Sequence, residues 1–123
     1  METINFKLCN LKNQKFTVEL LSDAVKFIEQ QEEKARKKII YNMTKAQFSN
    51  DPTLFKKLNG QIWEFRTLYN KNYYRIFSFW YETKSTLPVV ISTHGVIKKS
   101  KKVEKHDLER AISIKNQFLN QKN

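Results

Sequence analysis

The sequence has 123 residues, with 23 Lys and Arg against 12 Asp and Glu, so its formal net charge is +11. This length predicts one domain over 1–123, and a hydrophobic content of 40% excludes a wholly disordered chain, which would lack apolar residues for a core. The single cysteine, Cys9, excludes an internal disulfide and a cysteine-based zinc site, and we expect it to be a small apolar residue in a strand.

The first elements are predicted from the spacing of apolar residues. Apolar and polar residues alternate in 3–9 and again in 15–20, which predicts a β-hairpin. Ser22 and Asp23 are typical helix-capping residues, and helical spacing is found after them at Ala24, Phe27, Ile28 and Gln31. A second amphipathic helix is expected over 32–49.

The second half of the chain is rich in aromatic and β-branched residues. Pro52 disfavours helix at the residue before it and so ends the second helix. Strands are expected over 58–69, 73–82 and 88–97, with turns between them, and a last helix over 104–120. The order β-β-α-α-β-β-β-α predicts an α+β domain with an antiparallel sheet, N-terminal helices packed on one face and a C-terminal helix. We expect the helices on one face of the sheet and strand-borne cations on the other.

The excess of basic residues indicates a polyanionic partner, such as a nucleic acid. No apolar stretch approaches the roughly 20 residues of a membrane helix, and 1–11 lacks the apolar run of a signal peptide. We therefore expect a cytoplasmic protein without a membrane partner.

Two arginines fall in consecutive predicted strands. Arg66 and Arg75 are placed to pair across the turn at 70–72, and paired residues share a face of the sheet. A phosphate between the two guanidiniums would satisfy both, because the forked guanidinium matches phosphate oxygens. The structural alternative is an ion pair of Arg75 with Glu64 or Glu82.

Lysines flank these strands. A run of lysines leaves the last predicted strand and enters the last helix, and two more precede the strand of Arg66. Together they could hold a nucleic-acid backbone in a salt-dependent way. The candidates are Lys56, Lys57, Lys98, Lys99, Lys101 and Lys102.

Groups for proton transfer are harder to choose. His94 in the last strand and His106 in the last helix are candidates, because a free imidazole titrates near neutral pH, although each could be structural. A lysine among Lys57, Lys98 and Lys99, with its pKa lowered by neighbouring cations, could serve instead. No glycine-rich phosphate loop and no His-Glu-x-x-His motif is found, so we expect neither a metal nor a cofactor.

Three motifs resemble those of one protein family. Residues 57–66, with the sequence KLNGQIWEFR, are similar to a motif of the RelE/ParE toxin superfamily, in its HigB-type, phage-related branch. YRIF at 74–77 and HGVIKKSKK at 94–102 resemble two further motifs of that branch. The resemblance covers 24–120 and implies a RelE-like fold.

The resemblance also implies a function. Members are metal-independent endoribonuclease toxins that cut mRNA on the ribosome and are covered by a helix-turn-helix antitoxin, here a HigA-like one. Arg66 matches a family arginine that contacts the scissile phosphate, and Arg75 matches the second strand arginine. Lys98 and Lys99 match a basic pair, and Lys57 matches the lysine before the glycine. The chain lacks the tyrosine near the C-terminus that some members use in catalysis.

Two other functions stay open. The ParE branch of the superfamily poisons DNA gyrase, and a basic module could bind RNA or DNA without cleaving it. Replacement of Arg66 separates these functions, because an enzyme would lose cleavage while a binding module would lose one phosphate contact.

Overall fold

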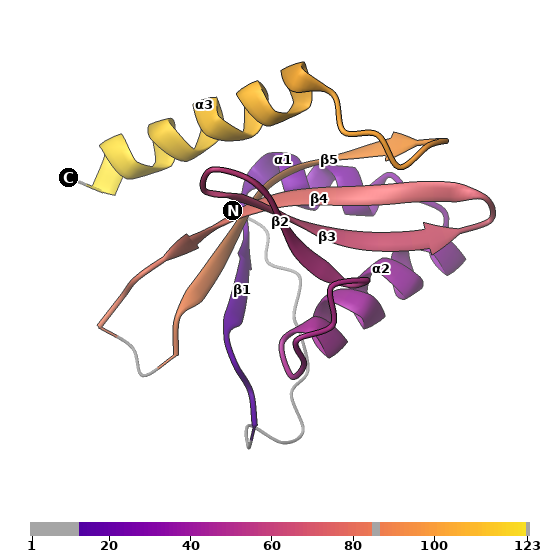
Figure 1. Cartoon of the computed structure of the whole chain (residues 1–123), viewed down its shortest axis with the longest axis horizontal. Helices are drawn as coiled ribbons and strands as arrows, with labels where there is room; N and C mark the ends of the chain where they lie inside the picture. Colours follow the sequence, from indigo (N-terminus) through magenta and orange to yellow (C-terminus); the bar gives the residue numbers. More distant parts are fainter. Residues whose placement is uncertain (1–12, 85–86, 123) are drawn as a thin grey trace.

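The computed structural model describes residues 13–84 and 87–122, which form a five-stranded sheet with helices on both faces (Figure 1). The strand expected over 3–9, with Cys9, lies outside the described residues. The elements are β1 (Thr17–Leu20), α1 (Ser22–Glu29), α2 (Glu33–Ala46), β2 (Phe55–Asn59), β3 (Ile62–Tyr69), β4 (Asn72–Tyr81), β5 (Val89–Lys98) and α3 (Lys105–Lys122). Among the described residues, no helix has the length and apolar character needed to span a membrane.

The sheet is mixed, with the strand order β1-β5-β4-β3-β2. β1 runs parallel to β5, with Thr17 opposite Val89, whereas the other neighbouring strands are antiparallel. The prediction of a wholly antiparallel sheet is therefore wrong at this edge. Parallel strands need a long crossover connection, and here the helices and three strands between β1 and β5 supply it.

The predicted strand over 58–69 is two strands in the structure. β2 ends at Asn59 and β3 begins at Ile62, and the turn between them contains Gly60 with a φ of +57°. Glycine adopts this left-handed conformation without the steric penalty that a Cβ atom brings. Lys56 and Lys57, which were expected to precede the strand, therefore lie inside β2.

The two N-terminal helices differ slightly from the prediction. Leu21 occupies the N-cap position of α1 without a side-chain hydrogen bond, so Ser22 lies in the first turn and does not cap the helix. Asp23 also lies in the first turn, where its charge favours the positive end of the helix dipole. α2 ends at Ala46, before the predicted end at 49.

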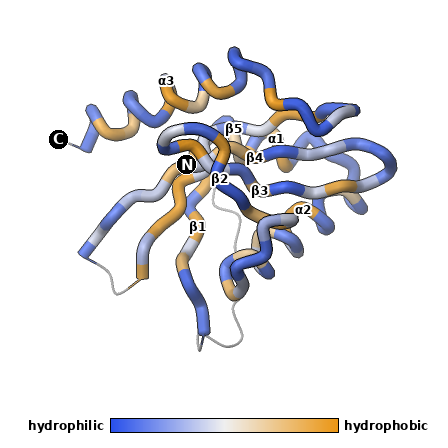
Figure 2. Tube along the Cα trace, viewed as in Figure 1, coloured by the Kyte–Doolittle hydropathy of each residue, from blue (hydrophilic) through white to orange (hydrophobic). Residues whose placement is uncertain are grey.

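Helices cover both faces of the sheet. α1 and α2 pack on one face, where Ile28, Ile39 and Met43 are fully buried against strand residues such as Ile76. α3 crosses the opposite face (Figure 1), where Ala111 packs against residues of β3 and β4. Hydrophobic residues recur at intervals along α3 in Figure 2. The expectation that all helices lie on one face is therefore wrong for α3.

Candidate functional site

Arg66 and Arg75 face each other across β3 and β4, as the turn position predicted. The face that carries them also carries Phe77, which packs with α3. The two guanidiniums therefore lie on the α3 side of the sheet, next to the segment that connects β5 to α3.

A buried carboxylate separates the two guanidiniums. Glu64 is fully buried, and its Oε1 accepts a hydrogen bond from Nη1 of Arg75 and lies 3.2 Å from Nε of Arg66. Burial raises the pKa of Glu64, while the charges of Arg75 and Arg66 act in the opposite direction. Glu64 thus supplies the negative charge for which a phosphate between the arginines was expected.

Arg75 is enclosed within the fold. Its side chain is 2% exposed, and Nη2 donates a hydrogen bond to the carbonyl oxygen of Ser100 at 3.3 Å. Its guanidinium also lies over the ring of Tyr73, 5.5 Å from the centroid. The structural alternative for Arg75, an ion pair with Glu64, is therefore the arrangement found, and the side chain of Arg75 is closed off from solvent.

Arg66 remains partly accessible. Its side chain is 20% exposed, and only its Nε faces Glu64. Within 13–84 and 87–122, no hydrogen bond or ion pair engages its two terminal nitrogens. These two nitrogens form the side of the guanidinium that can bind a phosphate through two parallel hydrogen bonds.

The predicted lysines fall into two groups. Lys56 lies opposite Glu64 in β2 and is exposed on the face of Arg66, and the exposed Lys99, Lys101 and Lys102 lie in the segment after β5. Lys57 lies opposite Trp63 and alternates to the other face. The first group could border an anion at Arg66, whereas Lys57 belongs to a different surface.

Lys98 is bound by two carboxylates. Its Nζ lies 3.4 Å from Oε2 of Glu104 and 3.3 Å from Oδ2 of Asp107. Burial opposes the charge of Lys98, but the contacts with Asp107 and Glu104 prevail and hold its pKa above the ordinary value. The hypothesis of a lysine with a lowered pKa is therefore wrong for Lys98.

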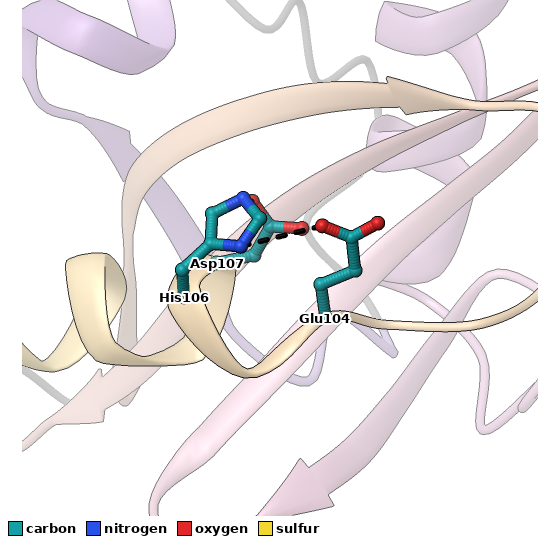
Figure 3. A group of neighbouring side chains, drawn as sticks. All are labelled: Glu104, His106 and Asp107. Carbon is teal, nitrogen blue, oxygen red and sulfur yellow. Dashed lines mark ion pairs between the residues drawn. The ribbon is translucent and has the colours of Figure 1, made fainter.

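His106 joins the same group at the start of α3 (Figure 3). Its Nδ1 lies 3.3 Å from Glu104 and its Nε2 lies 3.3 Å from Asp107. The ligand atoms of Glu104, His106 and Asp107 lie within 4.8 Å of one another, a spacing that a metal ion could use. The ammonium group of Lys98 already contacts both carboxylates, and its positive charge opposes a second cation there.

His94 is part of the interior. It is 1% exposed, its ring stacks on Phe77 with a centroid distance of 5.0 Å, and its Nδ1 lies 3.1 Å from Oγ1 of Thr93. Burial, aided by the charge of Arg110, lowers its pKa to about 4. This burial and the neutral ring at physiological pH argue against proton transfer to a bound substrate.

The sequence did not indicate that Glu104, Asp107 and the backbone of Ser100 belong to the site. The available signal was the position of Glu104 and Asp107 at the start of a helix that follows a lysine run. Acids at such positions favour the helix dipole and can also pair with the lysines before them.

The fold and site define a class of small α+β proteins with a RelE-like arrangement, in which a sheet presents an arginine beside exposed lysines. The family model of phage-derived Gp49-like proteins (DUF891) matches residues 26–116, and the chain belongs to this family. The family is one of RelE/HigB-like toxins. No curated protein matches the chain.

Proposed function

We propose that this protein is the HigB-type toxin of a type II toxin–antitoxin pair and that it cleaves mRNA on the ribosome without a metal ion. The observation that carries the proposal is the geometry of Arg66. Its Nε lies 3.2 Å from Oε1 of the buried Glu64, and its side chain stays 20% exposed. A guanidinium held in this way is preorganised for a phosphate.

The chemistry needs a cation at the reacting phosphate. In metal-free RNA cleavage the 2′-oxygen attacks phosphorus, the bond to the 5′-oxygen breaks, and the proton lost by the 2′-hydroxyl is balanced by a proton delivered to the leaving oxygen. The products are a 2′,3′-cyclic phosphate and a 5′-hydroxyl. Arg66 would stabilise the negative charge that develops on the pentacoordinate phosphorus, because two parallel hydrogen bonds match its oxygens.

The other basic residues of the site take different parts in this proposal. Lys56, Lys99, Lys101 and Lys102 are exposed and would contact flanking phosphates. Arg75 acts through Glu64 and through the carbonyl of Ser100, which ties the lysine segment to the sheet. Lys98 joins the same segment to α3 through its ion pairs.

The proposed partners follow from the family. A helix-turn-helix antitoxin of the HigA type would bind the toxin, and the ribosome would present the mRNA. The excess of positive charge on the chain suits both a negatively charged antitoxin surface and ribosomal RNA.

The test is mapping of mRNA 5′ ends after a short pulse of expression. The unchanged protein, Arg66→Ala and Arg110→Ala are compared, with a ligation step that captures 5′-hydroxyl ends. Arg110 is the matched control, because it is an exposed arginine on α3 that forms a surface ion pair with Asp23. We expect new ends inside translated frames with the unchanged protein and Arg110→Ala, and loss of these ends with Arg66→Ala.

Two outcomes would contradict the proposal. Growth arrest without new mRNA ends would exclude ribonuclease activity and favour a different target, such as DNA gyrase. Neither arrest nor new ends would leave a binding protein without this activity.

A further inference from the structure

Both tryptophans of the chain lie in one aromatic cluster. The rings of Trp63 and Trp80 meet at 82° with centroids 5.7 Å apart. Phe55 stacks on Trp63 at 5.0 Å, and Phe16 contacts Trp80 edge-on at 5.1 Å. Trp80 nevertheless stays 38% exposed, so a large aromatic surface faces solvent on β4.

Two hollows meet at this tryptophan pair. The first has a volume of about 300 Å³ and lies between the start of β1, the loop after α2 and β2. The second has a volume of about 400 Å³ and lies between the β2–β3 turn and the C-terminal half of α3, which approach each other in Figure 1. Trp63 and Trp80 line both hollows. Their sizes fall at the lower end of those of small-molecule sites.

The charges around the pair have one sign. Lys15 and Lys56 line the first hollow, and Lys57 and Lys115 line the second. Neither lining contains an acidic residue among the described part of the chain. We call the four lysines, the two tryptophans, Phe16 and Phe55 the tryptophan surface. Aromatic rings beside cations are how proteins bind single-stranded nucleic acid, with bases on the rings and phosphates on the cations.

The tryptophan surface and the candidate site share Lys56. Lys56 lines the first hollow and also lies opposite Glu64, the carboxylate beside Arg66. Trp63 precedes Arg66 by three residues in β3, which corresponds to roughly 10 Å along a strand. The two residues are on opposite faces, and β2 is the edge strand around which an extended nucleic-acid strand would pass.

We propose that the tryptophan surface is a subsite for single-stranded RNA, in which a nucleobase stacks on Trp80 and neighbouring phosphates pair with the lysines. This inference rests on the proposed function, since it names where the RNA continues beyond the phosphate at Arg66. It also accounts for Lys57, which the candidate site leaves out.

The test uses the tryptophans as the probe. Because the chain has no tryptophan elsewhere, its intrinsic tryptophan fluorescence reports this surface alone. The protein is titrated with an eight-nucleotide RNA that carries 2′-O-methyl groups throughout, so that it cannot be cleaved by attack of a 2′-hydroxyl. An abasic oligonucleotide of equal length and inorganic polyphosphate are the ligand controls. We expect saturable quenching with the RNA and much weaker quenching with both controls.

Two variants locate the binding. Trp80→Leu is expected to weaken RNA binding, measured by anisotropy of a labelled RNA, by about tenfold, because one stacking contact is lost. Lys115→Gln is expected to reduce the dependence of binding on salt. The matched controls are Tyr41→Leu, an aromatic residue 63% exposed on α2, and Lys34→Gln, an exposed lysine of the same helix. Both controls should bind as the unchanged protein does, and thermal unfolding of each variant shows that it is folded.

The outcomes separate this inference from the proposed function. Equal quenching by RNA and by polyphosphate would overturn the base-stacking subsite, as would unchanged RNA affinity of a folded Trp80→Leu. If that variant instead loses binding to the antitoxin alone, the surface docks a protein and the inference is wrong. Quenching by RNA with no cleavage in cells would overturn the proposed ribonuclease activity and support the subsite. Cleavage in cells without quenching would support the ribonuclease activity and overturn the subsite.

Discussion

At the scale of single residues, Glu64 is the centre of the candidate site. Transfer of a carboxylate and a guanidinium from water into a protein interior costs free energy. The attraction between the two charges offsets this cost only when their geometry is good. Here one oxygen atom of Glu64 contacts both arginines, and Arg75 gains a further acceptor in the carbonyl of Ser100. The arrangement positions Arg66 at the edge of the cluster, where it is the arginine that can meet an anion.

His94 gives a prediction about pH. Its pKa is lowered from 6.5 to about 4 in the folded protein, so the unfolded chain binds the proton first as the pH falls. The free energy of unfolding should therefore decrease between about pH 6.5 and pH 4, by roughly 3 kcal/mol at most from this group. Denaturant unfolding at steps of pH measures the decrease.

The control for this prediction is His94→Phe, which retains a ring against Phe77 and cannot titrate. The difference in stability between the unchanged protein and the variant should change across this pH window and be constant above pH 7. A difference that stays flat from pH 7 to pH 4 would show that His94 is not the titrating group.

At the scale of elements, α1 and β5 approach each other closely at a glycine. A Cβ atom added at Gly95 would lie 2.3 Å from a ring carbon of Phe27 in α1. We predict that Gly95→Ala lowers the free energy of unfolding by about 1–3 kcal/mol, which is typical of overpacking. Equilibrium denaturation in urea measures the loss.

A second substitution tests the cause. Phe27→Leu removes the ring, so Gly95→Ala should cost less in a protein that already carries Phe27→Leu. If the two effects simply add, the clash with the ring is not the reason for the loss.

Local contacts could be predicted from the sequence, and distant ones could not. The pairing of Arg66 with Arg75 follows from the position of one turn, and the helices before Pro52 follow from apolar spacing. The parallel pairing of β1 with β5, the hydrogen bond from Arg75 to Ser100, and the position of α3 on the arginine face depend on contacts between distant parts of the chain. No period in the sequence indicates which of these distant partners meet.

The candidate site shows the same limit. The basic residues were predicted, because their charge is evident in the sequence. Their accessibility was not predicted, because it depends on which acid lies close to each of them. Glu64 forms an ion pair with Arg75, and Glu104 and Asp107 form ion pairs with Lys98. The residues left accessible after these pairings, Arg66 and Lys56 among them, form a smaller set than the sequence suggested.

At the scale of the whole molecule, internal ion pairs increase the basic character of the surface. Two buried acids, Glu64 and Asp107, are held in ion pairs, while most lysines stay exposed. A molecule of net charge +11 with this distribution attracts polyanions over a distance comparable to the Debye length.

This charge gives a prediction about salt. If about four phosphates are neutralised, the affinity for the methylated RNA should fall roughly 50-fold between 50 and 200 mM salt, because each contact with a single strand releases counterions. The Arg66→Ala protein should show a shallower dependence by about one contact. Anisotropy titrations at several salt concentrations measure both slopes. Equal slopes for the two proteins would show that Arg66 makes no phosphate contact in the bound state.

The parallel pair of β1 and β5 has a consequence for synthesis. Thr17 pairs with Val89, and β5 is the strand next to β1 within residues 13–84 and 87–122, so β1 leaves the ribosome long before that partner is synthesised. The β3–β4 hairpin, whose contacts are local, can form early, whereas the edge of the sheet closes late. The anchor of Arg75 on Ser100 is completed still later along the chain. A nascent copy therefore acquires its complete arginine cluster only when translation of its own message is almost finished.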